Sequence, residues 1–227
     1  DPAALACFVA ATEPRFAERE VGVWPGEQSN TTLTLGTADL YKLFRKVEPG
    51  PNLDAEVLVA LAGANVPDVH GRLLGPWPTD SSTDLGMVIE RVPGARDGWQ
   101  VATAACAAEE DFTEDARALG EALRDVHVRL ADAFGTQERP GAEIADLMST
   151  RLDAAVADAP QLEPYAEALR ATFGRLRPES MTVQRVHGDF HLGQTLVSPT
   201  GWTIIDFEGE PAKTAAERRA FDSVWRD

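Results

Sequence analysis

Residues that could carry out chemistry gather between positions 185 and 197, in the segment RVHGDFHLGQTLV. Asp189 precedes Gln194 by five positions there, and Asp206 directly follows a later apolar run, WTII. A carboxylate that accepts a hydroxyl proton, followed by an amide and a second carboxylate that hold a divalent cation, is an arrangement used for phosphoryl transfer. Oxygen ligands suit Mg²⁺, which would neutralise the charge of a transferring phosphate.

Two other interpretations of this segment are open from the spacing alone. His187 and His191 lie four residues apart and could bind zinc, but no helix carries them and no cysteine or third histidine lies near. Asp189 could instead form a turn by accepting hydrogen bonds from backbone amides. The combination of the Asp189–Gln194 spacing with the sequence IIDFEGE at 204–210 favours phosphoryl transfer over both.

Composition limits the partners of the chain. The 227 residues are 44% hydrophobic and 26% charged, which is typical of a globular protein, and their formal net charge is -16. Nucleic acid and anionic membranes would be approached against a repulsive field, so neither is an expected partner. Cys7 and Cys106 are far apart, and no apolar stretch approaches the length that crosses a membrane. We therefore expect a cytoplasmic protein.

The N-terminal elements that must position these residues alternate β-type runs with turn signals. A hairpin is predicted over 31–47, and a short helix over 53–63 begins after Asn52 or Asp54 and ends at Gly63. The Pro- and Gly-rich passage 70–82 is predicted as a connector, followed by a strand over 84–92.

The remainder of the chain has helical periodicity. Apolar residues recur every three or four positions over 112–134, and further helices are predicted over 143–159 and 162–176. Two strands, 184–189 and 201–209, are expected to flank the polar segment. A last amphipathic run is predicted to form a helix that continues past Asp227, so we expect the chain to be a fragment of a longer protein.

Five segments together resemble the actinobacterial maltokinases, a branch of the aminoglycoside-phosphotransferase-like kinases; they are EQSNTTLTLG, YKLFRKVEPGPN, ERVPGARDGW, VHGDFHLGQTLV and GWTIIDFEGEPAKTAAERR. The resemblance implies an α+β, protein-kinase-like bilobal fold. Its small antiparallel-sheet N-lobe with one helix would span 1–91 and its mostly helical C-lobe 92–227, truncated at both ends. The implied reaction is transfer of the γ-phosphate of ATP to maltose, giving maltose 1-phosphate for α-glucan synthesis, with a trehalose synthase as a possible partner.

The same resemblance implies roles on the nucleotide side. Lys42 matches the phosphate-binding lysine, and Glu56 matches its ion-pair partner. Three residues of EQSNTT, namely Ser29, Asn30 and Thr31, would cover the phosphates. Backbone groups between Glu90 and Val92 would contact adenine at the hinge between the lobes.

On the acceptor side, Asp189 matches the catalytic base. Gln194 and Asp206 match the Mg²⁺ ligands, and Glu208 is a further candidate ligand or sugar contact. His187 is expected to hold the loop by hydrogen bonds, whereas His127 is given no role.

Other functions stay open at this point. Related kinases act on glucosamine or on aminoglycosides, and a degenerate kinase fold could be a non-catalytic binding module. The negative net charge would favour a cationic amine. However, the segment DFEGEPAKTAAERR carries Lys213, Arg218 and Arg219 beside acidic residues, and such mixed charge could bind neutral hydroxyls. On that ground maltose is the predicted acceptor.

Overall fold

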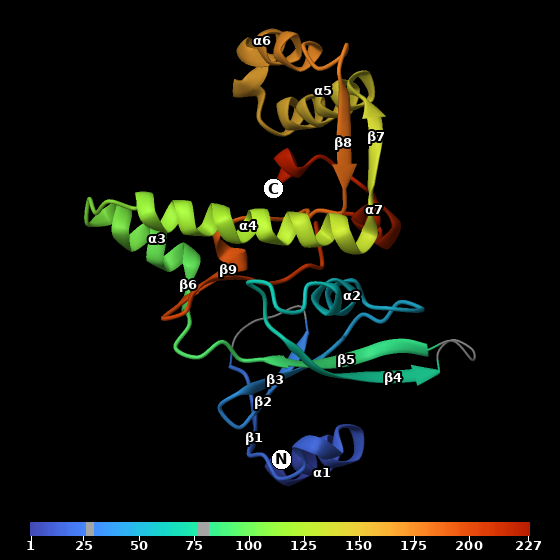
Figure 1. The fold of residues 1–227 in the computed structure, drawn as a ribbon, viewed down its shortest axis with the longest axis vertical. Helices are drawn as coiled ribbons and strands as arrows, with labels where there is room; N and C mark the ends of the chain where they lie inside the picture. Colours follow the sequence, from blue (N-terminus) through green and yellow to red (C-terminus); the bar gives the residue numbers. More distant parts are fainter. Residues whose placement is uncertain (26–29, 77–81) are drawn as a thin grey trace.

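The structure is a computed structural model that describes residues 1–25, 30–76 and 82–227. It has an N-terminal lobe built on a β-sheet and a C-terminal lobe that is mostly helical (Figure 1). This is the predicted α+β, two-lobed architecture. Ser29, predicted to help cover the phosphates, lies outside the described residues.

The sheet of the N-terminal lobe has five antiparallel strands: β1 (Val21–Val23), β2 (Thr31–Leu35), β3 (Asp39–Leu43), β4 (Val69–Pro76) and β5 (Ser82–Glu90). Their spatial order is β1-β2-β3-β5-β4. The predicted hairpin is confirmed as β2 and β3, and the strand predicted over 84–92 is β5. The predicted connector over 70–82 is wrong, because most of it forms β4. As an edge strand, β4 tolerates the glycines and Pro76 that suggested a loop.

The two faces of this sheet are covered by different parts of the chain. Helix α1 (Pro2–Thr12) packs on the outer face, where Val9 and Phe16 join side chains of β2, β3 and β5 in one apolar cluster. Helix α2 (Leu53–Ala60) packs on the inner face in a second cluster, which includes Phe207 of the C-terminal lobe. The predicted helix start is confirmed, since the Asn52 side chain caps α2 by accepting from the Ala55 amide. The inner cluster therefore joins the two lobes.

Five helices build the C-terminal lobe: α3 (Gly98–Ala107), α4 (Thr113–Phe134), α5 (Gly141–Asp158), α6 (Glu163–Gly174) and the short α7 (Ala215–Arg219). The three helices predicted over 112–176 are confirmed as α4, α5 and α6. Helix α4 crosses the middle of the molecule beneath α5 and α6 (Figure 1). Its apolar face, with Ala122, Val126 and Leu130, belongs to the same cluster as α2.

Short strands connect these helices: β6 (Arg96–Asp97), β7 (Thr136–Pro140), β8 (Ser180–Gln184), β9 (Thr195–Ser198) and β10 (Gly201–Ile204). Strand β8 ends at Gln184, so the strand predicted over 184–189 is wrong. Residues 185–194 form a loop between β8 and β9, with a 3₁₀ turn at Leu192–Gln194. The polar segment therefore lies on a loop whose position depends on contacts with other elements.

The helix predicted at the end of the chain is also wrong. Gln184 and Asp222 exchange two backbone hydrogen bonds of 3.0 and 2.8 Å, which hold the chain extended at that point. A single 3₁₀ turn follows at Val224–Arg226, and Trp225 is 87% exposed. The turn's position beside β8 brings the last residues to the loop that carries Asp189.

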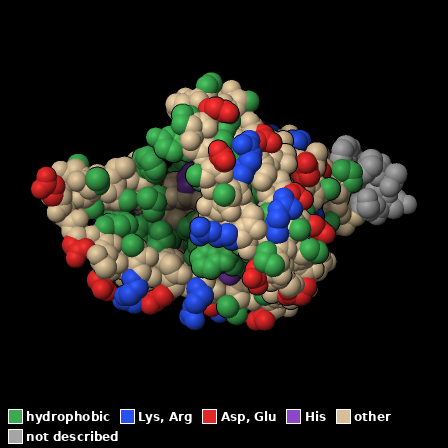
Figure 2. All heavy atoms as spheres, turned by 90° about the horizontal axis from the view of Figure 1, so that it is seen from above, with side chains coloured by type: hydrophobic (Ala, Val, Ile, Leu, Met, Phe, Trp, Pro, Cys, Tyr) green, Lys and Arg blue, Asp and Glu red, His purple; other side chains and the backbone are tan. Residues whose placement is uncertain are grey.

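The surface mixes both charges. On the face seen in Figure 2, acidic and basic side chains are interspersed, and hydrophobic side chains gather around a hollow. Among the described residues, no helix combines the length and apolar character needed to cross a membrane.

Candidate active site

A cleft of about 300 Å³ is lined by residues of both lobes. Its lining brings together five of the residues predicted from the sequence: Asn30, Asp189, Gln194, Asp206 and Glu208. Asn30 lies beside β2, whereas the other four come from the loops before β9 and after β10. Carboxylates and amides separated by up to 178 positions in the sequence thus face one space.

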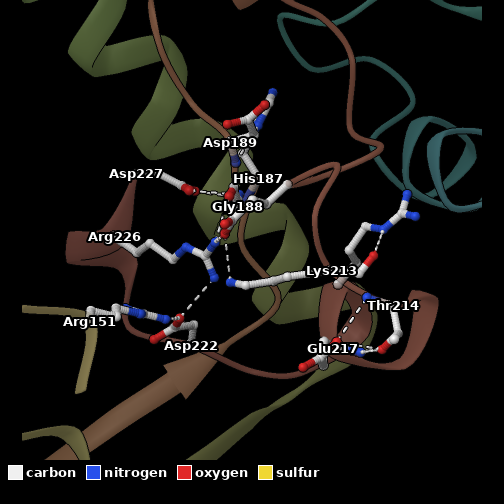
Figure 3. A network of polar contacts seen from close by, with 12 residues as sticks. Arg151, His187, Gly188, Asp189, Lys213, Thr214, Glu217, Asp222, Arg226 and Asp227 are labelled. Carbon is white, nitrogen blue, oxygen red and sulfur yellow. Dashed lines mark hydrogen bonds and ion pairs between the residues drawn. The ribbon is translucent and has the colours of Figure 1, made fainter. Parts of the chain in front are cut away.

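The loop that carries Asp189 is fixed through the two residues before it (Figure 3). The Asp227 carboxylate accepts hydrogen bonds of 2.8 Å from the backbone amides of both His187 and Gly188. His187 is 2% exposed, and its Nε2 lies 3.0 Å from the Ile205 carbonyl oxygen. These contacts support the prediction that His187 holds the loop. Gly188 has φ +83°, a conformation that glycine adopts without strain.

Gln194 and Asp206 are neighbours through their backbones. The Ile205 amide donates to the Gln194 carbonyl oxygen at 3.0 Å, so the residue before Asp206 is tied to Gln194. Asp206 itself has φ +66°, which is uncommon for a residue other than glycine. Such conformations cluster at functional sites, where the surrounding structure imposes them.

Glu208 extends this acidic group toward the N-terminal lobe. Burial raises the pKa of the Glu208 carboxyl, and a hydrogen bond from Asn30 opposes that rise. The Asn30 Nδ2 atom donates to Glu208 Oε1 at 2.8 Å. This contact joins the two sides of the cleft.

Lys42 forms a buried ion pair, but its partner differs from the prediction. Lys42 Nζ lies 2.9 Å from Asp54 Oδ2, and the Asp54 side chain is fully buried. Asp54 Oδ1 also accepts from the Phe207 amide at 3.0 Å, directly after Asp206. Burial alone would lower the pKa of Lys42, but the charge and hydrogen bond of Asp54 raise it above its ordinary value. The lysine is therefore held as a cation beside the acidic group.

Glu56 does not pair with Lys42, so this predicted role is wrong. Its Oε2 lies 3.2 Å from Arg219 Nε and 3.6 Å from Arg185 Nη2. The reason is its place on α2: Asp54, two residues earlier, faces the sheet, and a helix turns by about 200° over two residues. Glu56 consequently faces the C-terminal lobe.

The other residues predicted to contact the nucleotide lie at two separate places, beside Thr31 and at the hinge between the lobes. The Thr31 hydroxyl accepts a hydrogen bond from Arg45 at 3.0 Å. At the hinge, the Glu90 amide donates to Asp68 and the Arg91 amide donates to Ala38, each at 2.8 Å. Both N–H groups are already bonded within the protein. Val92 is half-buried and follows directly.

Three residues of the site were missed by the sequence interpretation: Asp54, Arg226 and Asp227. Asp54 was considered only as a helix cap, although it lies in the same turn as Glu56. The final dipeptide was read as part of an amphipathic helix, and nothing in that periodicity indicated contact with the Asp189 loop. His127 also takes part, because its Nε2 lies 3.0 Å from Asp227 Oδ2.

The zinc interpretation has no support in the geometry. The His191 ring accepts a hydrogen bond from the Gly193 amide at 3.1 Å, while His187 is engaged with Ile205. Within residues 1–25, 30–76 and 82–227, no three His, Cys, Asp or Glu side chains form a group that could hold a metal by themselves. The Mg²⁺ set predicted from the motifs differs in kind, because it includes the amide of Gln194.

Comparisons with known proteins identify relatives over most of the chain. Residues 25–209 match the phosphotransferase enzyme family. A glucosamine kinase from Streptacidiphilus jiangxiensis is 32% identical, over 95% of this chain and 53% of the relative. One from Mycolicibacterium smegmatis is 26% identical, over 92% and 56%. A solved glucosamine kinase in complex with glucosamine, ADP and inorganic phosphate gives a TM-score of 0.71 at 25% identity, over 92% of this chain and 54% of that one.

These relatives overturn the predicted sugar. The maltokinase assignment is wrong, because the curated relatives are glucosamine kinases. The predicted α-glucan pathway and trehalose synthase partner followed from maltose alone and lose their support with it. The chain spans about half the length of the curated relatives that it matches.

The structure explains why the argument from mixed charge failed. Lys213 pairs with Glu210 at 2.9 Å, and Arg219 is held by Glu56. Arg218 donates to the backbone carbonyl oxygens of Glu208 and Lys213. These cations stabilise the loop after Asp206, and the segment's charge pattern therefore says little about the acceptor.

The kinase-like fold is confirmed by the sheet lobe, the helical lobe and the similarity to the solved glucosamine kinase. On the match that covers residues 25–209, the chain belongs to the phosphotransferase enzyme family.

Proposed function

We propose that the protein is part of an ATP-dependent amino-sugar kinase, which transfers the γ-phosphate of ATP to a hydroxyl group of glucosamine. The observation that carries this proposal is that Asp189, Gln194, Asp206 and Glu208 line one cleft. The glucosamine kinase relatives support the acceptor.

Asp189 is the proposed general base. It lies on a loop whose preceding backbone amides are fixed by Asp227, and its side chain lines the cleft. A carboxylate so held could accept the proton of an acceptor hydroxyl while keeping that hydroxyl in position for attack.

Oxygen-bearing side chains of the same cleft would hold Mg²⁺ and the phosphates. Gln194 and Asp206 are the proposed ligands, with Glu208 as a third, and oxygen ligands are what Mg²⁺ prefers. The positive φ of Asp206 and the half-buried Glu208 fit a site built for a ligand rather than for folding. When bound, the ion would neutralise charge on the phosphates. Lys42 would add a fixed cation beside them, with Asp54 as its partner.

Charge also favours an amine as the acceptor. The formal net charge is -16, so a cationic sugar is attracted to the protein where a neutral one is not. Long-range attraction acts on the encounter rate and is screened over about 8–10 Å at physiological ionic strength. A preference that persists in salt would therefore come from groups in the pocket.

A non-catalytic binding module is the competing function. It predicts loss of one or more of Lys42, Asp189, Gln194 and Asp206, yet all four are present. Lys42 is ion-paired next to the cleft that the other three line. Their proximity favours an enzyme.

The test is a comparison of kcat/KM for glucosamine, N-acetylglucosamine, glucose, maltose and kanamycin, at low and at physiological salt. Glucosamine should exceed each neutral sugar by at least about tenfold, which corresponds to ~1.4 kcal/mol. A preference for maltose or kanamycin under both salt conditions would reject glucosamine while leaving phosphoryl transfer intact. Absence of ATP turnover with every acceptor would reject the kinase.

A further inference from the structure

The loop that carries Asp189 lies next to the loop after Asp206 at two glycines. A Cβ atom placed on Gly188 would lie 3.9 Å from the Cα atom of Gly209, so even a methyl group at position 188 would reach van der Waals contact with the Gly209 backbone. Both glycines have positive φ, +83° and +70°. The geometry of this junction sets where Asp189 lies relative to Asp206.

Arg226 spans the junction (Figure 3). Its Nη2 atom donates to the Gly188 carbonyl oxygen at 2.8 Å and lies 2.8 Å from Glu210 Oε2. One nitrogen thus contacts the Asp189 loop and the loop after Asp206 at once. The adjacent Asp227 accepts from the Gly188 amide, so both peptide groups that flank Gly188 are held.

The Arg226 side chain is itself held by Asp222. Its Nη1 lies 3.1 Å from Asp222 Oδ2, and Arg151 of α5 binds the same carboxylate oxygen at 2.8 Å. The Arg226 side chain is only 18% exposed, which limits screening by water. A planar guanidinium with several fixed donors suits a site with acceptors on three sides.

We propose that Arg226 is a positioning residue that fixes the separation between the base loop, residues 187–189, and the ligand loop, residues 206–210. It acts through Gly188 and Glu210 and has no contact with substrate. The proposal rests on the proposed function, because it assigns Arg226 to the same phosphoryl transfer. Misplacement by about 1 Å can cost two orders of magnitude in rate, so a residue of this kind should affect turnover more than nucleotide binding.

The test compares Arg226→Gln with Arg151→Gln, a matched control that loses a bond to the same Asp222 carboxylate and acts on Glu210 through its charge, but forms no direct hydrogen bond to either loop within the described residues. Arg226→Gln should lower kcat by at least about tenfold and change the KM for ATP by less than about twofold. Arg151→Gln should retain kcat within about twofold. When Glu210 is already changed to Gln, adding Arg226→Gln should lower kcat by a smaller factor than Arg226→Gln does in the wild type, because the two side chains act as a pair.

A readout without sugar separates this proposal from the proposed function. Amide hydrogen exchange in peptides covering residues 185–190 should be faster in Arg226→Gln and unchanged in Arg151→Gln. If the wild type phosphorylates no sugar, the proposed function fails. Amide hydrogen exchange then decides by itself whether Arg226 holds the Asp189 loop in place. Equal exchange in both variants, near-native kcat in folded Arg226→Gln, or an equal loss in Arg151→Gln would each overturn the proposal. Where Arg226→Gln does not fold, Arg226→Lys is judged by the same criteria.

Discussion

The two sides of the cleft are held together by different forces. On the N-terminal side, α2 is embedded in an apolar cluster, and its Asp54 pairs with Lys42 only twelve positions earlier. On the C-terminal side, hydrogen bonds join the backbone of the Asp189 loop to the side chains of Asp227 and Arg226, 40 and 38 positions later, and Phe190 adds a contact with the same apolar cluster. One side is a packed core with a buried ion pair, and the other is a loop tied by polar contacts.

This difference predicts a separation of effects. Changes on the N-terminal side should chiefly lower the free energy of unfolding, because they leave a buried charge inside a packed core. Loss of the polar contacts on the C-terminal side should chiefly lower turnover, because these contacts position the two loops and leave the apolar cluster unchanged. The following variants test that separation.

The largest effect is expected for Asp206→Ala. Removing the proposed Mg²⁺ ligand should reduce kcat with glucosamine by at least about a thousandfold, or ~4 kcal/mol of transition-state stabilisation. Calorimetry should show that Mg²⁺ no longer strengthens ATP binding, while thermal melting stays close to that of the wild type. Glu48→Gln changes an exposed residue that lines the same cleft, and as the matched control it should keep both the turnover and the Mg²⁺-dependent ATP binding of the wild type. Full turnover in Asp206→Ala would remove Asp206 from the site.

Asp54→Asn should cause the largest loss of stability. It leaves Lys42 charged inside the core, at a cost of about 3–5 kcal/mol. Chemical denaturation measures this directly. Asp125→Asn is the control, because Asp125 pairs with Arg129 on the surface of α4 and both side chains are more than a third exposed. A cost below about 1 kcal/mol for Asp54→Asn, as for a surface pair, would contradict the account of the N-terminal side.

Glu56→Gln tests the corrected pairing on the same helix. Burial lowers the pKa of the Arg185 guanidinium, and the charge of Glu56 opposes this effect. Losing that charge should cost about 1–3 kcal/mol, less than Asp54→Asn because Glu56 and Arg219 are partly exposed. Chemical denaturation curves of Glu56→Gln and Asp54→Asn, measured under the same conditions, show which variant loses more unfolding free energy. A larger loss of unfolding free energy in Glu56→Gln than in Asp54→Asn would contradict Asp54 as the main partner of Lys42.

The smallest effect concerns pH. Burial would raise the pKa of Asp227, but hydrogen bonds from His127 and from the Gly188 and His187 amides lower it overall. A carboxyl whose folded-state pKa is depressed stabilises the protein above its unfolded pKa, about 3.9, and that contribution is lost as the pH falls through the folded-state pKa. The stability difference between the wild type and Asp227→Asn should therefore be constant near pH 7 and shrink below about pH 4. A difference that grows in acid would contradict the depressed pKa.

The sequence predicted those features of the cleft that depend on residue patterns within one short segment. Alternation of apolar residues predicted β2 and β3, and Asn52 correctly marked the start of α2. The five-residue offset of Asp189 and Gln194, with Asp206 after an apolar run, predicted side chains that line one cleft. These features depend on spacing within one element or between neighbours.

The parts that were missed depend on contacts between distant segments. Glu56 and Asp54 both fit a carboxylate near Lys42, and only the rotation of α2 against the sheet decides between them. Arg226 and Asp227 belong to a segment for which periodicity predicts a helix that continues past Asp227, because no local pattern shows that β8 pairs with Asp222. The acceptor was also misjudged, since the charges of Lys213, Arg218 and Arg219 are used within the fold.

The most direct test of the proposed phosphoryl transfer is glucosamine-dependent release of ADP by the wild type and by Asp189→Asn. The wild type should release ADP from Mg²⁺-ATP only when glucosamine is added. Asp189→Asn should be slower by about 10²–10⁴-fold, the range for a positioned general base, while Mg²⁺-ATP still raises its melting temperature. ADP release that does not depend on glucosamine, or equal rates in the two proteins, would contradict the account.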